Sequence, residues 1–195
     1  MRRFVKSARP SSRATETWQS VVPLIFFAHA TSSHNETGVR SGWADPPLSD
    51  RGRQQARNLG RLAAGPFESV YTSDLIRARQ TAAIAFPDLG RTAVPDLREM
   101  HYGKLTAASD DLFPTDPEAC ITVRFPGGEC CLDVEVRVRR FLDEYVRPDT
   151  PVAVVGHKYT QLAFEVILNG HSWQSAIEAD WRARGEWRPG WDYPT

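Results

Sequence analysis

The 195-residue sequence lacks long hydrophobic runs, and none of its apolar segments approaches the roughly 20 residues that a membrane-spanning helix needs. It also lacks an excess of either charge, because 24 Lys and Arg residues balance 24 Asp and Glu residues. We therefore expect no membrane insertion and no general nucleic-acid binding, although a local basic pocket stays compatible with this balance. Residues 1–20 are basic but contain no continuous apolar core, so the sequence predicts a flexible N-terminal tail rather than a secretory signal.

Cysteine is scarce as well. The three cysteines are Cys120, Cys130 and Cys131, an odd number in which two members are adjacent. This arrangement fits no disulfide framework, and no metal-ligand spacing joins the cysteines to the histidines. We therefore expect reduced thiols in a cytoplasmic protein, without a bound metal or another cofactor.

Short apolar segments alternate with helical patterns along the chain. The predicted strands are residues 24–28, 69–72, 92–94 and 152–155. One predicted helix begins at Ser49 or Asp50 and a second at Ser73 or Asp74, and further helical patterns cover residues 132–146 and 160–168. This order predicts an α/β fold, a three-layer sandwich whose mostly parallel central sheet carries helices on both faces.

We expect residues 21–195 to form a single domain. Residues 97–126 show no clear period, and the part from about 103 to 126 is predicted to be an insertion or lid beside the functional site. The C-terminal segment contains Trp173, Trp181, Trp187 and Trp191, which predicts a closing strand or hairpin packed on the sheet. These tryptophans suit a subunit interface equally well, so a homodimer stays open.

Two of the predicted strands end at a histidine. His29 and His157 each follow a buried apolar run, and open α/β sheets bind their ligands at the carboxyl ends of such strands. Arg77 lies one turn into the helix that follows another strand, and a helix start with a guanidinium favours an anion. Each residue taken alone is as easily structural. Together they predict a phosphate site, because phosphate matches a fork of Arg donors best.

At this point the sequence resembles the histidine phosphatase superfamily, with its phosphoglycerate-mutase-like fold, and more specifically its small phosphatases. Six blocks carry the resemblance in the family's order, which makes the combined signal strong although each block is weak. The blocks are residues 28–35 (AHATSSHN), 40–56 (with Arg40, Gly42-Trp43, Asp45, Leu48, Gly52 and Gln55-Ala56), 73–82 (SDLIRARQTA), 97–103 (LREMHYG), 126–130 (PGGEC) and 154–157 (VVGH).

The resemblance implies a reaction through a phosphohistidine. His29 would attack phosphorus, Arg77, His157 and Asn35 would bind the transferred oxygens, and Glu99 would protonate the leaving oxygen. Additional phosphate or substrate contacts are expected from Ser32, Arg40 and Lys158. No metal takes part in this chemistry.

The sequence departs from the family pattern beside the nucleophile. The family's Arg-His-Gly reads Ala28-His29-Ala30 here, and that Arg normally donates to the phosphate. Losing such a donor typically costs on the order of 10²–10³ in rate. Either another cation, Lys158 or Arg40, fills the gap, or the site has diverged toward weak activity or another reaction. Ala30 in place of Gly is a milder departure, because both residues are small. Cys130 replaces the Ser of the Gly-Gly-Glu-Ser block.

The sequence favours a metal-independent phosphomonoester hydrolase that acts on a small phosphorylated metabolite. The predicted lid is short and carries Asp110, Asp111, Asp116 and Glu118 against a single Lys, which disfavours a highly phosphorylated substrate. Two alternatives remain. One is a diverged member with a mutase or phosphotransfer reaction, and the other is a non-catalytic protein that binds a phosphorylated ligand.

Overall fold

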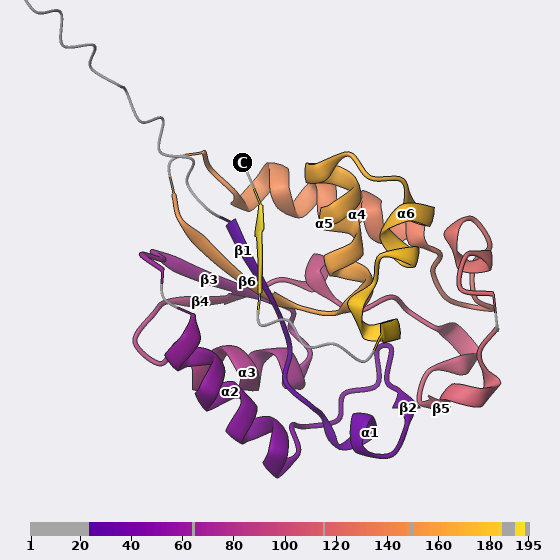
Figure 1. Ribbon diagram of the computed structural model, residues 1–195, viewed down its shortest axis with the longest axis horizontal. Coiled ribbons are helices and arrows are strands. Elements are labelled where there is room, and N and C mark those ends of the chain that lie inside the picture. Colours follow the sequence, from indigo (N-terminus) through magenta and orange to yellow (C-terminus); the bar gives the residue numbers. More distant parts are fainter. Residues whose placement is uncertain (1–23, 64, 115, 149, 185–189, 194–195) are drawn as a thin grey trace, which may run out of the picture.

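The computed structural model describes residues 24–63, 65–114, 116–148, 150–184 and 190–193. Its centre is a five-stranded sheet in the order β4-β3-β6-β1-β7 (Figure 1). The strands are β1 (Leu24–Ala28), β3 (Ser69–Thr72), β4 (Arg91–Ala93), β6 (Val152–Gly156) and β7 (Trp191–Tyr193). The first four are parallel, and β7 runs antiparallel to β1 at one edge. A separate small ladder pairs β2 (Val39–Arg40) with β5 (Ala108–Ser109).

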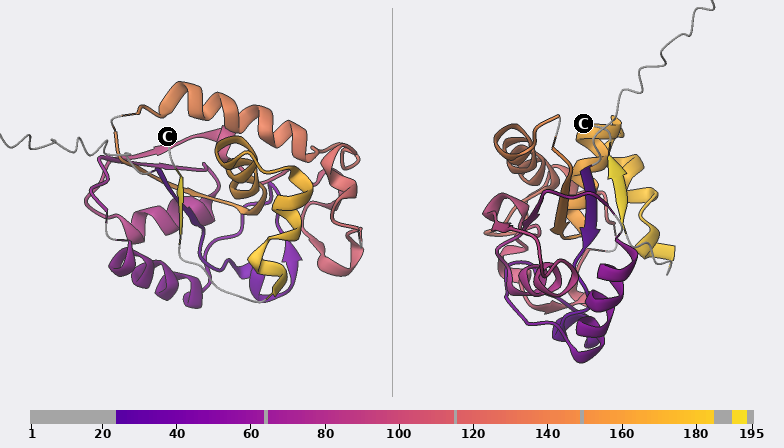
Figure 2. Two further views of the ribbon diagram at one scale, coloured as in Figure 1. Left: turned by 45° about the horizontal axis from the view of Figure 1, so that its top comes forward. Right: turned by 90° about the vertical axis from the view of Figure 1, so that its left-hand side faces the viewer.

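Helices cover both faces of this sheet, as the sequence predicts. On one face lie α2 (Asp50–Leu62) and α3 (Ile76–Ala85), and on the other lie α4 (Cys131–Tyr145), α5 (Lys158–Asn169) and α6 (Trp173–Glu178) (Figures 1 and 2). A single turn, α1 (Ser33–Glu36), follows β1. The expected three-layer α/β sandwich with a mostly parallel sheet is therefore confirmed.

The two faces of the sheet explain why the central strands are apolar throughout. In β1, Phe26 packs into the cluster formed with α4 and α5, while Phe27 packs into the cluster formed with α2 and α3. In β6, Val154 and Val155 divide in the same way. Because successive strand residues point to opposite faces, a strand covered on both sides needs apolar residues at every position.

The register of β1 and β6 determines where the two histidines leave the sheet. Ala28 stands opposite Gly156, the last residue of β6, so the residue after each strand emerges at the same level. The backbone N–H of His29 donates to the carbonyl of Gly156 at 2.9 Å, which extends the ladder by one step. His29 and His157 are therefore neighbours at the carboxyl edge of the sheet, where α/β folds place ligands.

The predicted starts of two helices are wrong by about two residues. α3 begins at Ile76 rather than after Ser73 or Asp74, and the N–H of Ile76 donates to Asp45 at 2.6 Å. α5 begins at Lys158 rather than Thr160, and its first N–H groups donate to Glu99. In both cases a carboxylate from a distant segment caps the helix, which local sequence patterns do not reveal.

The C-terminal segment closes the sheet, as predicted, by placing β7 beside β1. The predicted lid contains 3₁₀ turns at Gly103–Leu105, Asp110–Leu112 and Ala119–Ile121 together with β5. All three cysteines are free. Trp187 and the predicted basic tail, residues 1–20, lie outside the described residues.

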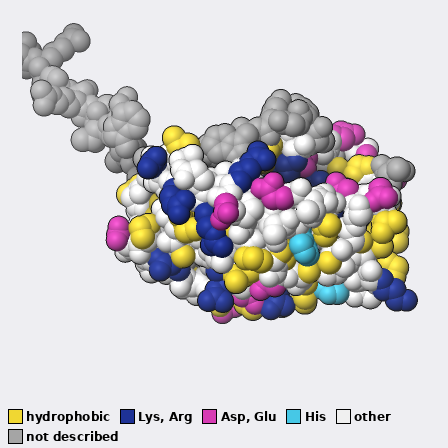
Figure 3. Space-filling view, turned by 90° about the horizontal axis from the view of Figure 1, so that it is seen from below, with side chains coloured by type: hydrophobic (Ala, Val, Ile, Leu, Met, Phe, Trp, Pro, Cys, Tyr) yellow, Lys and Arg dark blue, Asp and Glu magenta, His cyan; other side chains and the backbone are white. Residues whose placement is uncertain are grey.

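Charges of both signs are interspersed among the described side chains on the face in Figure 3. A search of the helices in the described part of the chain finds none long and apolar enough to cross a membrane.

Candidate active site

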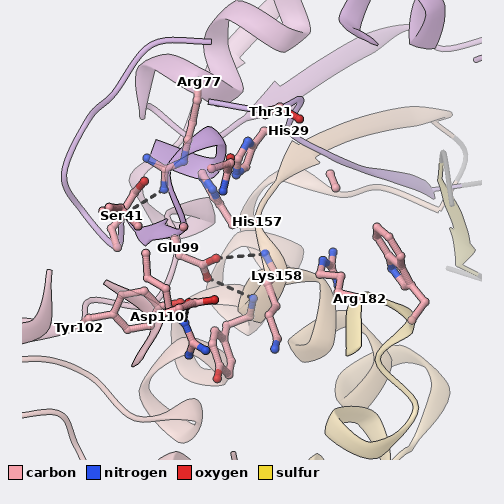
Figure 4. A pocket seen from close by; sticks show the side chains of 18 residues that line it. His29, Thr31, Ser41, Arg77, Glu99, Tyr102, Asp110, His157, Lys158 and Arg182 are labelled. Carbon is pink, nitrogen blue, oxygen red and sulfur yellow. Dashed lines mark hydrogen bonds and ion pairs between the residues drawn. The ribbon is translucent and has the colours of Figure 1, made fainter. Parts of the chain in front are cut away.

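A cavity of about 400 Å³ opens at the carboxyl ends of β1 and β6. It is lined by all four residues predicted to be catalytic, namely His29, Arg77, Glu99 and His157 (Figure 4). Of the predicted substrate-binding residues, Asn35, Arg40 and Lys158 also line it. Residues that lie far apart in the sequence therefore meet around one space.

His29 is held as a neutral imidazole with one nitrogen free. Its Nδ1 lies 2.7 Å from the carbonyl oxygen of Ala30. A carbonyl only accepts hydrogen bonds, so Nδ1 carries the proton and Nε2 keeps its lone pair. Loss of solvation, followed by the nearby charge of Arg77, lowers the pKa of His29 to about 3. The imidazole is therefore an unprotonated nucleophile at neutral pH.

His157 is fully enclosed beside it, with the two ring centroids 5.0 Å apart. Burial, and then the charge of Arg77, holds the pKa of His157 well below its usual range. Among the described residues neither ring nitrogen has a hydrogen-bond partner. Unpaired buried polar atoms are costly, and a ligand oxygen in the cavity would satisfy the N–H of this ring.

Arg77 is 2% exposed, and part of its guanidinium is committed to the protein. One terminal nitrogen donates to the carbonyl of Ala44 and the other to the carbonyl of Gly42, both at 2.9 Å. These two bonds fix the plane of the fork, and the remaining N–H groups are left for a ligand. The predicted role of Arg77 as an anion-binding residue fits this geometry.

Glu99 lies across the cavity at the start of α5 (Figure 4). Its Oε1 accepts from the backbone N–H of Met100 at 2.9 Å and of Tyr159 at 3.1 Å. Its Oε2 accepts from the N–H of Lys158 at 3.2 Å. Three backbone donors therefore orient a carboxylate that is only 7% exposed.

The backbone that carries Glu99 is held by two side chains, Trp43 of the second family block and Arg137, to which the sequence assigned no role. Trp43 Nε1 donates to the carbonyl of Glu99 at 2.7 Å, and an Arg137 nitrogen donates to the same oxygen at 3.1 Å. Arg137 also pairs with Glu129 at 3.0 Å. Arg137 lies on the helix predicted over residues 132–146, where an Arg is ordinarily solvated, so nothing in the helical pattern reveals this contact.

The loop after His29 is fixed by the two helices beneath the sheet. The N–H of Ala30 donates to Thr81 Oγ1 at 3.0 Å, and the N–H of Thr31 donates to Gln55 Oε1 at 2.9 Å. Gly52 packs so closely that a Cβ there would lie 1.9 Å from the carbonyl oxygen of Thr31. Helix α2 therefore supports the nucleophile through close backbone contact.

Two predicted substrate-binding residues act as a pair. Ser32 caps the short helix α1, and both its N–H and its hydroxyl donate to Asn35 Oδ1, at 2.9 and 2.8 Å. This leaves the amide N–H groups of Asn35 for the cavity that it lines. The expectation that Ser32 itself contacts substrate does not fit the structure, because Ser32 is fully buried and is not among the lining residues.

The cations near the mouth of the cavity are paired with acids. Arg40 forms an ion pair with Asp110 and lies 4.3 Å over the ring of Phe113. Lys158 Nζ is 3.1 Å from Asp180. Sequence reasoning missed Arg182, a further cavity-lining residue, because it follows the motif-bearing part of the chain and belongs to no recognisable pattern.

The family model described as "Histidine phosphatase superfamily (branch 1)" matches residues 24–181. Among curated relatives, the 2,3-bisphosphoglycerate-dependent phosphoglycerate mutase of Streptococcus pyogenes (serotype M5, strain Manfredo) is 39% identical over 94 residues. This match covers 44% of the chain and 41% of the mutase, so it spans less than half of either protein.

Two solved structures extend the likeness to most of the fold. The protein TTHB049 from Thermus thermophilus is 31% identical with a TM-score of 0.65, and the match covers 75% of this chain and 85% of that one. A protein of Escherichia coli K-12, described as a candidate alpha-ribazole-5′-P phosphatase, is 28% identical with a TM-score of 0.70. That match covers 81% of this chain and 84% of the other.

Proposed function

Because the chain belongs to the histidine phosphatase superfamily (branch 1), we propose that it hydrolyses a small phosphomonoester through a phosphohistidine on His29. One observation carries this proposal. A neutral histidine with a free Nε2 shares one cavity with a second buried histidine, a buried arginine and a buried carboxylate. These groups together supply a nucleophile, oxyanion donors and a proton carrier.

In the first step His29 Nε2 attacks phosphorus, so that a nitrogen–phosphorus bond forms while the bond from phosphorus to the ester oxygen breaks. Glu99 gives its proton to the departing oxygen, which leaves as an alcohol. In the second step water attacks the phosphohistidine and passes a proton to Glu99. The nitrogen–phosphorus bond breaks, inorganic phosphate leaves, and Glu99 is protonated again for the next cycle.

Charge on the transferred phosphoryl group is stabilised by fixed donors. Arg77 offers the N–H groups that it does not use on Gly42 and Ala44, His157 offers a ring N–H, and Asn35 offers its amide. In phosphoryl transfer the protein contributes mainly positioning and electrostatic stabilisation, so donors already held in place are what the reaction requires.

The size and charge of the cavity favour a small substrate. The cavity volume of about 400 Å³ lies at the lower end of the range for small-molecule sites, which suits a substrate of the size of a phosphosugar. At its mouth Asp110 neutralises Arg40, which disfavours a second phosphate on the substrate. A small phosphorylated substrate also agrees with the alpha-ribazole-5′-P that the description of one structural relative names.

A second reaction is favoured by a different observation. The 39% identity to phosphoglycerate mutases over 94 residues favours a reaction in which the phosphoryl group passes to a second hydroxyl instead of to water. Phosphate release and mutase activity are measured in the same assay with 3-phosphoglycerate and a trace of 2,3-bisphosphoglycerate. Isomerisation faster than phosphate release would make the protein a mutase.

The direct test is turnover of p-nitrophenyl phosphate in the presence of a chelator. We expect His29→Ala to lower kcat at least about 10³-fold, because covalent catalysis requires this nitrogen. His171→Ala is the matched control, since His171 is an exposed histidine after α5 and outside the cavity-lining set. Equal turnover by the wild type and His29→Ala would refute the proposed function, and no turnover by either would favour a binding protein.

A further inference from the structure

The end of β1 lacks the cation that the family pattern places there. Ala28 lines the cavity directly before the nucleophile but brings no donor to it. The four residues predicted to be catalytic all line the cavity. The site therefore needs a replacement for one guanidinium, or it lacks one phosphate donor.

A cluster formed by Asp180 and Arg182 of the C-terminal segment and by Lys158 of α5 brings positive charge to the same cavity. Asp180 is buried, with its side chain 1% exposed, and it contacts two cations. Lys158 Nζ lies 3.1 Å from one oxygen, and an Arg182 nitrogen lies 2.9 Å from the other. One carboxylate between two cations leaves an excess of one positive charge, which is the charge that a single motif arginine would bring.

The packing of Arg182 places it on the Ala28 side of the sheet. Its guanidinium lies 4.7 Å from the ring centroid of Trp181 and 5.5 Å from that of Trp191. Trp191 stands opposite Phe26 in the β1–β7 register, and Phe26 and Ala28 share one face of β1 because they are two residues apart. Arg182 and Ala28 both line the cavity, where Arg182 and Lys158 lie on the opposite side from Arg77 and Ser41 (Figure 4).

Part of the Arg182 fork is uncommitted. Its Nη1 contacts Asp180 and Gln161, whereas the buried Nη2 has no hydrogen-bond partner among the described residues. The charge of Arg182 also reaches the nucleophile, since it contributes to the lowered pKa of His29. A buried guanidinium nitrogen without a partner at the wall of an anion site is a donor that a bound phosphate would satisfy.

We propose that Arg182, held by Asp180 and the two tryptophans, binds the transferred phosphoryl group. It replaces the arginine that the family pattern has at the position of Ala28. Lys158, on the same carboxylate, supplies the second charge of the cluster. This assignment rests on the proposed phosphatase function and adds a phosphate-binding residue to it. It also gives a reason for Ala28, because an arginine there would bring a second guanidinium against Arg182, and like charges at short distance repel.

The test is a double-mutant cycle on positions 28 and 182, assayed with p-nitrophenyl phosphate and with inorganic phosphate as a competitive inhibitor. We expect Arg182→Gln to lower kcat/KM about 10²-fold and to weaken inhibition by phosphate, because a charged donor to the phosphoryl group is lost. Arg182→Lys should lose less, since it keeps the charge. Ala28→Arg should recover at least about 10-fold in the Arg182→Gln background and give no gain in the wild type.

Arg57→Ala is the matched control, since Arg57 is an exposed arginine of α2 outside the cavity-lining set, and its side chain donates to Gln54. Each variant is checked for the wild-type melting temperature, so that loss of folding is separated from loss of binding. Unchanged kcat/KM in Arg182→Gln would overturn the assignment, and so would a loss that Ala28→Arg does not reduce. His29→Ala is measured in parallel. Turnover that does not depend on His29 refutes the proposed function. Turnover that depends on His29 but is unchanged in Arg182→Gln refutes only this inference.

Discussion

Three side chains of the site divide their polar groups between the protein and the cavity. His29 uses Nδ1 on a backbone carbonyl and keeps Nε2 free. Asn35 uses its oxygen on Ser32, and Arg77 uses two N–H groups on the loop carbonyls. The part committed to the protein fixes the orientation of the part offered to the ligand. Such preorganisation lets donors act without rearranging as the reaction proceeds.

Glu99 permits a prediction that separates proton transfer from binding. We expect Glu99→Gln to slow hydrolysis of an alkyl phosphate by about 10²–10⁴-fold, because an alkoxide is a poor leaving group without a proton. The loss with p-nitrophenyl phosphate should be much smaller at the first step, since nitrophenolate leaves unprotonated. Single-turnover release of the alcohol or phenol from each ester measures the difference.

The control for this prediction is Glu144→Gln on the outer part of α4, where the glutamate is exposed. The side-chain amide oxygen that Glu99→Gln introduces can still accept from the N–H groups of Met100 and Tyr159, so binding of inorganic phosphate should persist. An equal loss for both leaving groups would contradict the assignment of Glu99 as the proton donor.

At the scale of secondary-structure elements, the loop after β1 depends on helices that lie beneath it. Gly52 allows α2 to approach the carbonyl of Thr31, where a Cβ would meet the oxygen at 1.9 Å. The second element on this loop is α3, through Thr81. The nucleophile is therefore positioned by packing between helices and loop, in addition to its own hydrogen bond.

We predict that Gly52→Ala disturbs the site although residue 52 is outside the cavity-lining set. Backbone cannot move aside as a flexible side chain does, so the loop that follows His29 must shift. A shift of about 1 Å in a reacting group typically costs on the order of 10²-fold in kcat. The matched control is Gly90→Ala, because the Cβ position of Gly90 has open space around it. Gly60 is unsuitable as a control, because it also packs tightly. Wild-type kcat in Gly52→Ala would show that this contact does not position His29.

Element starts and the site were predictable to different degrees. The apolar runs of β1 and β6 predict buried strands, and the histidines that end them predict the edge where the ligand lies. The caps of α3 and α5 were not predictable, because Asp45 and Glu99 come from distant segments. Local patterns report hydrogen bonds within a few residues of one another, and both of these caps join residues far apart in the sequence.

The roles of individual residues divide in the same way. His29, Arg77, Glu99 and His157 were identified because motif order carried them, and the cavity brings them together. Arg182 had no such signal, since it lies one residue beyond the part matched by the family model. Its place in the site arises only when β7 and the tryptophans bring the C-terminal segment back to β1.

At the scale of the whole molecule, the two histidines of the site make stability depend on pH. The pKa of His29 is lowered to about 3 and that of His157 well below its usual range, whereas an unfolded histidine titrates near pH 6.5. As pH falls below about 6.5 the unfolded chain binds protons that the folded protein does not. The free energy of unfolding therefore falls with pH in this window, by about 2 kcal/mol per histidine between pH 7.5 and 5.

Urea denaturation at pH 7.5, 6 and 5 measures this dependence. His29→Asn should lose less stability than the wild type over the same interval, with a difference of about 2 kcal/mol at pH 5, because one of the two proton-linked groups is gone. The matched control is His171→Asn, which removes a histidine at an exposed position outside the cavity-lining set. Parallel curves for the wild type and His29→Asn would contradict the depressed pKa of His29.

Rapid chemical quenching shows whether His29 carries the phosphoryl group during turnover. The protein is mixed with p-nitrophenyl phosphate, quenched in alkali within one turnover, digested and analysed by mass spectrometry. We expect one phosphoryl group on the peptide that contains His29, labile in acid and stable in alkali, and absent from His29→Ala. Rapid turnover without phosphate on His29, or phosphate on another residue, would contradict this expectation.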